Sequence, residues 1–95
     1  MAAYMIAKID IIDPEQYKKY IAATPAVIAE FGGKFIARGG ETVTLEGPEE
    51  KRRVALVEFP SLDKVREFYA SAEYQEVMKL REGAATVSLI AIPGV

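Results

Sequence analysis

Histidine and cysteine are both absent from this sequence, so any chemistry must use arginine, lysine, carboxylate or tyrosine side chains. Their absence excludes a disulfide framework, a thiolate nucleophile and a histidine-held metal. Arg38 stands out, because it lies two positions beyond Ile36 in GGKFIARGGE, a segment that otherwise has an apolar strand pattern. A guanidinium presents a forked pair of donors to a carboxylate or an enolate. Glu58, on another expected strand, could orient such an arginine or accept a proton.

The segments that carry Arg38 and Glu58 are expected to pair as strands, which leaves three interpretations open. A buried or interfacial ion pair between them could fix register or dimer geometry without binding anything. Alternatively, Arg38 holds the negative charge of a ligand, with Glu58 as the catalytic acid or base. In the third interpretation, Arg38 simply reaches solvent. A bulge at Gly39-Gly40 would favour the ligand, because bulges cluster where a side chain is re-aimed.

Apolar, β-branched runs predict where the strands lie. They cover residues 4–12, 34–38, 53–59 and 86–92. Residues 42–46 resume an extended pattern after the two glycines, which predicts one long, bent second strand with its bulge at Gly39-Gly40. This strand and the next form a hairpin.

Helical spacing and capping residues predict two helical regions. Asp13 can cap the first, with Pro14 in its first turn and Gln16 closing a capping box. Pro25 lacks an amide hydrogen and predicts a kink or a fresh start there. The second region runs over 61–81, capped by Ser61 and again by Ser71. The order is that of an α+β, ferredoxin-like β-α-β-β-α-β sandwich, an antiparallel four-stranded sheet with helices on one face.

Alternate residues along these strands divide into two sets, one for each face of the sheet. One set is wholly apolar and is predicted to pack against the helices: Met5, Ala7, Ile9, Ile11, Phe35, Ala37, Ala55, Val57, Phe59, Val87, Leu89 and Ala91. The other set is mixed: Tyr4, Ile6, Lys8, Lys34, Ile36, Arg38, Val54, Leu56, Glu58, Thr86, Ser88, Ile90 and Ile92. In water this second face would be an apolar patch that monomers rarely tolerate.

The simplest cover for the mixed face is the same face of a second copy, which predicts a two-fold homodimer. Its interior would then hold polar groups among aliphatic ones, as small-molecule pockets do. The predicted site comprises Arg38 and Glu58 as catalytic residues, and Tyr4, Lys8 and Ser88 as ligand-binding residues.

Other polar residues are assigned to structural roles. Tyr17 and Tyr20 follow helical spacing and are interpreted as packing residues. Arg81 is expected to complement a helix dipole or pair with a glutamate. The run from Glu49 to Arg53 is interpreted as a solvated turn. Scattered carboxylates predict no metal site.

Length and charge narrow the remaining possibilities. The 95 residues fit a single domain over 1–95. A net charge of −2 provides no basic stripe for phosphate backbones, so nucleic acid is not an expected partner. The first apolar run lacks a basic segment before it and contains Lys8 and Asp10, which predicts neither a signal peptide nor a membrane span. The expected location is the cytoplasm.

Several segments together resemble domain-of-unknown-function family 1330, within the dimeric α/β-barrel superfamily. They are YMIAKIDIIDPEQYKKY, FGGKFIARGG, LEG, VEFPS and FYASAEYQEV, and the resemblance covers nearly the whole chain. Ala72 departs from the family, which often has proline there, and Phe68 stands where tryptophan is frequent. The family's motif positions in this chain are Asp13, Tyr17, Gly33, Arg38, Gly39, Glu46, Gly47, Glu58, Phe59, Pro60, Tyr69, Ser71 and Tyr74.

The resemblance implies a ferredoxin-like homodimer whose two sheets face each other around a barrel. It adds Tyr69 and Tyr74 to the ligand-binding candidates. Relatives in the wider superfamily include cofactor-free monooxygenases, lactone isomerases and haem enzymes, and histidine-held haem is excluded here. The mixed face of the sheet predicts a pocket for a small anionic organic molecule, and with the resemblance this indicates an isomerase-like or monooxygenase-like enzyme that uses no cofactor. The alternative is a non-catalytic ligand-binding or structural and interaction dimer.

Overall fold

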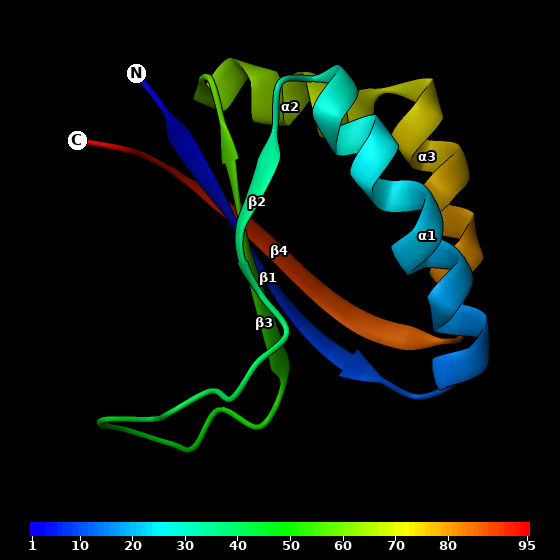
Figure 1. Cartoon of the computed structure of the whole chain (residues 1–95), viewed down its shortest axis with the longest axis vertical. Helices are drawn as coiled ribbons and strands as arrows, with labels where there is room; N and C mark the ends of the chain where they lie inside the picture. Colours follow the sequence, from blue (N-terminus) through cyan, green and yellow to red (C-terminus); the bar gives the residue numbers. More distant parts are fainter.

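The computed structural model of the chain describes all residues from 1 to 95 (Figure 1). Four strands form one sheet in the order β2-β3-β1-β4, and every neighbouring pair is antiparallel. The strands are β1 (Ala3–Ile11), β2 (Lys34–Arg38), β3 (Arg53–Phe59) and β4 (Ala85–Pro93).

The helical layer covers one side of this sheet (Figure 1). It consists of α1 (Pro14–Glu30), α2 (Leu62–Ala70), α3 (Ala72–Met78) and the 3-10 turn η1 (Lys79–Arg81). The predicted α+β, ferredoxin-like fold is therefore confirmed. None of the helices has the combination of length and hydrophobicity that a membrane span requires.

The three predicted capping residues each begin a helix. Asp13 accepts from the Gln16 amide at 3.3 Å, Ser61 from the Lys64 amide and Ser71 from the Tyr74 amide. The Gln16 side chain does not close a capping box. Instead its amide donates to the Glu82 carbonyl at 2.9 Å, which ties the start of α1 to the segment before β4.

Pro25 neither ends nor restarts α1, which continues unbroken from Pro14 to Glu30. The prediction of a fresh start at this proline was therefore wrong. The Thr24 hydroxyl donates to the Tyr20 carbonyl, next to the carbonyl of Ile21 that the proline leaves without an amide donor. Packing of the buried face of α1 keeps the helix continuous, because tertiary contacts override a weak local propensity.

The second strand differs from its prediction in length and in the place of its bulge. Residues 42–46 form no strand, because β2 ends at Arg38, where Gly39 and Gly40 take the left-handed φ values of +70° and +146°. The register shifts between Phe35 and Ala37, so the bulge lies at Ile36 and not at the glycines. Residues 39–52 then extend away from the sheet as an arm (Figure 1).

A charged cluster holds the base of this arm. The Glu50 carboxylate accepts from the Arg52 guanidinium at 2.9 Å and lies 3.5 Å from the Lys8 ammonium on β1. Hydrogen bonds from Arg52 lower the pKa of Glu50 to about 2. The arm is thereby anchored to the open face of the sheet.

Aromatic rings occupy the centre of the core, between the helices and the sheet. The Phe68 ring is fully buried, with its centroid 4.4 Å from Tyr74, 5.3 Å from Phe59 and 6.2 Å from Phe31. One side chain of α2 thus joins α3, β3 and the residue that follows α1.

We expect Phe68→Ala to destabilise the fold by about 3–5 kcal/mol, because it leaves a cavity where four rings meet. Ile12→Ala, at a side chain that is 65% exposed, should change stability by no more than about 0.5 kcal/mol. Urea unfolding at one fixed protein concentration measures the change in stability of each variant. Equal losses for the two variants would contradict this description of the core.

Candidate functional site

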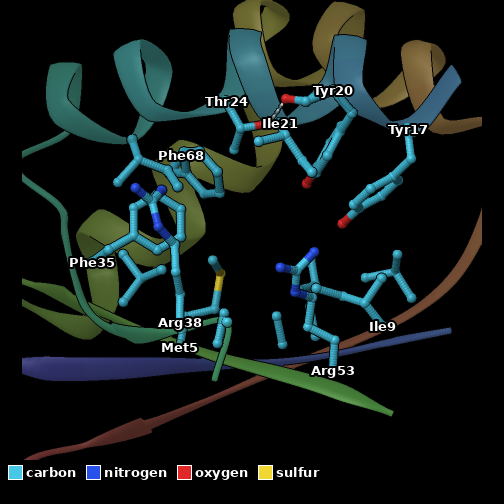
Figure 2. A pocket seen from close by; sticks show the side chains of 17 residues that line it. Met5, Ile9, Tyr17, Tyr20, Ile21, Thr24, Phe35, Arg38, Arg53 and Phe68 are labelled. Carbon is cyan, nitrogen blue, oxygen red and sulfur yellow. Dashed lines mark hydrogen bonds between the residues drawn. The ribbon is translucent and has the colours of Figure 1, made fainter. Parts of the chain in front are cut away.

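A cavity of about 380 Å³ lies between α1 and the helix-covered face of the sheet (Figure 2). We call it the helix–sheet pocket. Side chains from all four strands form its floor, and α1 and Phe68 form its roof. Thirteen of its 17 lining residues are hydrophobic, and its volume falls within the usual range for small-molecule sites.

Arg38 enters this pocket because of the bulge in β2. Side chains alternate with a period of two, so one extra residue moves those that follow to the opposite face. Arg38 is therefore paired with Ala55 on the helix-covered face, and Ala37 with Leu56 on the open face. The Arg38 guanidinium carbon lies 4.3 Å from the centroid of the Phe35 ring, a cation–π contact that places it at the pocket mouth.

Arg53 supplies a second guanidinium to the same pocket. It begins β3 opposite Ile9, so its side chain rises from the sheet toward α1, as that of Arg38 does (Figure 2). A Cβ on Gly39 would lie 3.3 Å from the Arg53 Nη2 atom. With φ at +70°, Gly39 lets the chain turn away beside the Arg53 side chain.

The pocket carries positive charge that no carboxylate in the chain neutralises. Neither Arg38 nor Arg53 lies within 4 Å of an acidic side chain. No aspartate or glutamate lines the pocket. Two like charges over apolar walls make a positive local potential, which attracts organic anions.

Tyr17 and Tyr20 line the pocket, and Tyr74 lies behind them in the core. Burial raises the pKa of Tyr17, against the opposing charge of Arg81. The Tyr20 and Tyr74 hydroxyl oxygens lie 2.6 Å apart, and burial, together with this contact, raises the pKa of Tyr74 strongly. Tyr17 and Tyr74 thus stay protonated at neutral pH, which makes them hydrogen-bond donors and not bases.

Most of the predicted site residues lie on the other side of the sheet. Glu58 stands opposite Tyr4 and forms an ion pair with Lys34 at 3.5 Å. Lys8 stands opposite Ser88. The prediction that Arg38 and Glu58 share one face was wrong, because the bulge had been expected only after Arg38, and the ion pair that was one of the three interpretations does not form.

The two tyrosines added by the family resemblance lie in the helical layer. Tyr74 is buried in the core, where its ring contacts Phe68. Tyr69 is 45% exposed and faces a second cavity, between α2 and β4. Neither residue meets the open-face group of Tyr4, Lys8, Glu58 and Ser88.

Sequence reasoning missed Arg53 and treated Tyr17 and Tyr20 as packing residues, although all three line the helix–sheet pocket. A signal for Arg53 was present, because it alternates with Ala55, Val57 and Phe59 and so extends the helix-facing set by one charged residue. No such signal marked the two tyrosines, because a tyrosine that lines a cavity and one that only packs in the core follow the same helical spacing.

The open face of the sheet keeps large apolar side chains in contact with solvent. Ile36, Ile90 and Ile92 are 46%, 57% and 54% exposed. Ile6 on β1 pairs with Leu56 on β3 and with Ile90 on β4, so these aliphatic side chains form a row across the open face. No group of three or more acidic side chains is placed to hold a metal ion.

Comparison with known proteins gives one family and several similar structures. The family described as domain of unknown function 1330 (DUF1330) matches residues 2–95. A protein of unknown function from Rhodopseudomonas palustris is 25% identical, with a TM-score of 0.76, covering 99% of this chain and 82% of that one. No protein of curated function matches.

Two further structures share the fold at lower identity. SnoaB, a cofactor-independent oxygenase from Streptomyces nogalater, is 15% identical with a TM-score of 0.70, over 99% of this chain and 93% of SnoaB. A dimeric ferredoxin-like protein of unknown function from Bacteroides fragilis is 17% identical with a TM-score of 0.64, over 98% and 96% of the two chains. Both show the fold of this chain.

The buried phenol pair predicts that stability falls in alkali. Tyr74 keeps its proton in the folded protein where the unfolded chain has lost it, so the unfolded state binds fewer protons above about pH 10 and the free energy of unfolding decreases there. We expect Tyr74→Phe to flatten this decrease, measured by urea unfolding between pH 8 and 11.

Tyr69→Phe is the matched control, because it leaves the Tyr20–Tyr74 contact intact. It should retain the full wild-type dependence on pH. A Tyr74→Phe variant that loses stability in alkali as steeply as the wild type would show that another group titrates.

Proposed function

Since the chain belongs to the DUF1330 family, whose function is unassigned, we propose from its site that it binds a small organic anion in the helix–sheet pocket. The observation that carries this proposal is the pair of guanidinium groups, Arg38 and Arg53, in a pocket without a carboxylate. An anionic ligand supplies the counter-charge that the chain omits.

The walls indicate the rest of the ligand. Phe35 and Phe68 offer aromatic surface, and Met5 offers a flexible thioether. Apolar side chains predominate around the cavity, so the ligand has an apolar body of modest size and a charged head near the rim. A carboxylate or an ionised enol on an aromatic or aliphatic skeleton has this form.

Cofactor-independent turnover of the bound anion is the second candidate function, favoured by the groups that can hold developing charge. Arg38 and Arg53 would stabilise negative charge, and the neutral Tyr17 phenol would donate a hydrogen bond. No lining side chain is a carboxylate, and Tyr17 is protonated at neutral pH, so a substrate would have to enter already ionised. The fold shared with SnoaB, a cofactor-independent oxygenase, is consistent with this candidate.

We further propose that the protein is a homodimer joined through the open faces of its sheets. The support is the exposed apolar set of Ile36, Ile90 and Ile92, together with a similar structure that is described as dimeric. A two-fold pair would bury this patch against itself. In this arrangement the open-face residues Tyr4, Lys8, Glu58 and Ser88 lie at the interface, whereas each helix–sheet pocket stays within one protomer.

Ligand binding is tested with 2-naphthoate and its neutral analogue 2-naphthamide, followed by NMR at the Gly39 backbone amide. The acid should bind more tightly than the amide. Arg38→Met should weaken acid binding by about three- to tenfold, because it removes one charged hydrogen bond at a partly exposed rim. The double variant Arg38→Met with Arg53→Met should remove the preference for the acid.

Arg52→Met is the matched control, because Arg52 is engaged by Glu50 outside the pocket. It should change the affinity by less than about twofold. Equal binding of acid and amide, or wild-type affinity in the double variant, would remove the two arginines from any binding role. Oxygen consumption, measured with an oxygen electrode in the presence of the acid, then distinguishes turnover from binding alone.

The dimer is tested by placing a charge on the open face. We expect Ile90→Glu to dissociate the protein into monomers in sedimentation velocity, because it places a carboxylate in the proposed apolar interface. Ala72→Glu introduces the same carboxylate at an exposed position of α3 and should leave the dimer intact. A wild-type protein that sediments as a monomer would refute the proposal.

A further inference from the structure

Arg81 is a partly buried arginine whose cation has no counter-charge in the chain. It ends η1, with its guanidinium carbon 5.4 Å from the centroid of the Tyr20 ring. Its Nε atom is buried and has no hydrogen-bond partner. No carboxylate lies within 4 Å of it, so the glutamate pairing that the sequence suggested does not form. A buried polar atom or charge without a partner lowers the stability of the fold unless a ligand, an ion or water pairs with it.

The surroundings of Arg81 keep it charged. Burial acts to lower its pKa, but the Tyr74 and Tyr20 phenols outweigh burial, so the pKa lies above the ordinary arginine value. Hydrogen bonding to the Tyr74 and Tyr20 hydroxyls contributes to this rise, whereas the buried Nε atom has no partner. Arg81 therefore remains a cation held among aromatic rings, with unused donor capacity.

A cavity of about 400 Å³ opens beside this cation, between α2 and β4. Its floor is apolar and comes from Val87, Leu89 and Ala91 on β4, and its wall includes Val65 and Tyr69 on α2. We call it the α2–β4 cavity.

Only two charged side chains line the α2–β4 cavity, Arg66 and Arg81. Asp63 engages Arg66 at 2.8 Å, which leaves Arg81 as the unpaired cation. No acidic residue lines the cavity. The cavity thus presents one guanidinium without an ion-pair partner above an apolar floor.

We propose that the α2–β4 cavity is a second ligand site, in which Arg81 binds the carboxylate of an amphipathic organic acid. The planar, forked donors of a guanidinium match a carboxylate in a two-point contact. The β4 floor then packs against the hydrocarbon part of the acid. This site stands apart from the helix–sheet pocket, whose charge comes from Arg38 and Arg53.

The test uses 3-phenylpropionate and its neutral analogue 3-phenylpropanamide as probes of the full-length protein. Amide NMR signals of Tyr69 and Ala91 report the α2–β4 cavity, and that of Gly39 reports the helix–sheet pocket. We expect the acid to shift the Tyr69 and Ala91 signals with a dissociation constant at least about fivefold lower than that of the amide.

Three variants assign that preference to Arg81. Arg81→Met should abolish it, and Arg81→Lys, which keeps the charge but loses the fork, should retain part of it. Arg66→Met is the matched control from the same cavity and should change the acid affinity by less than about twofold. Arg38→Met should leave the Tyr69 and Ala91 response unchanged.

Equal responses to acid and amide at Tyr69 and Ala91 would overturn the proposal, and this comparison needs only the wild-type protein. Wild-type affinity in a folded Arg81→Met variant would overturn it too. If Gly39 alone responds to the acid, the helix–sheet pocket stands and the second site fails. If Tyr69 and Ala91 alone respond, the second site stands without the first.

Discussion

The alternation of side chains across a four-stranded sheet is the constraint on which this structure depends. One face must pack beneath α1, α2 and α3, and the other is left open, so each residue's position in the pleat decides its surroundings. The single extra residue in β2 changes that assignment for Arg38. Without the bulge, Arg38 would stand on the face that carries Glu58, with the aliphatic patch around it. With the bulge, it stands over Phe35 at the mouth of a pocket.

The elements and their caps could be predicted from sequence because their causes are local. Ser71, for example, accepts from an amide three residues away, and a hydroxyl at that spacing needs no tertiary partner. The bulge could not be predicted, because Ile36 and Ala37 fit a regular alternation and only the pairing with β3 reveals the extra residue. Pro25 was misjudged for a related reason, since packing of the whole helix outweighed one local defect.

Charge is distributed unevenly between the surface and the space beneath the helices. The chain has a net charge of −2, yet the charged residues that line the helix–sheet pocket and the α2–β4 cavity are all arginines. Many of the carboxylates are engaged elsewhere, in exposed pairs one helical turn apart such as Lys18 with Glu15 and Lys79 with Glu76. Those pairs contribute little to stability. The acidic overall charge thus gives no indication of the arginines that gather around the two cavities.

The two cavities share part of a wall, formed by Met5, Val87 and Leu89. Met5 lies in the central strand β1, and its unbranched thioether can change rotamer at low cost. A different rotamer of that one side chain would redistribute space between the two cavities. Any effect of one occupant on the affinity of the other must then be reciprocal, by thermodynamic linkage. Coupling between occupants of the two proposed sites would thus pass through these shared side chains and would require no motion of the backbone.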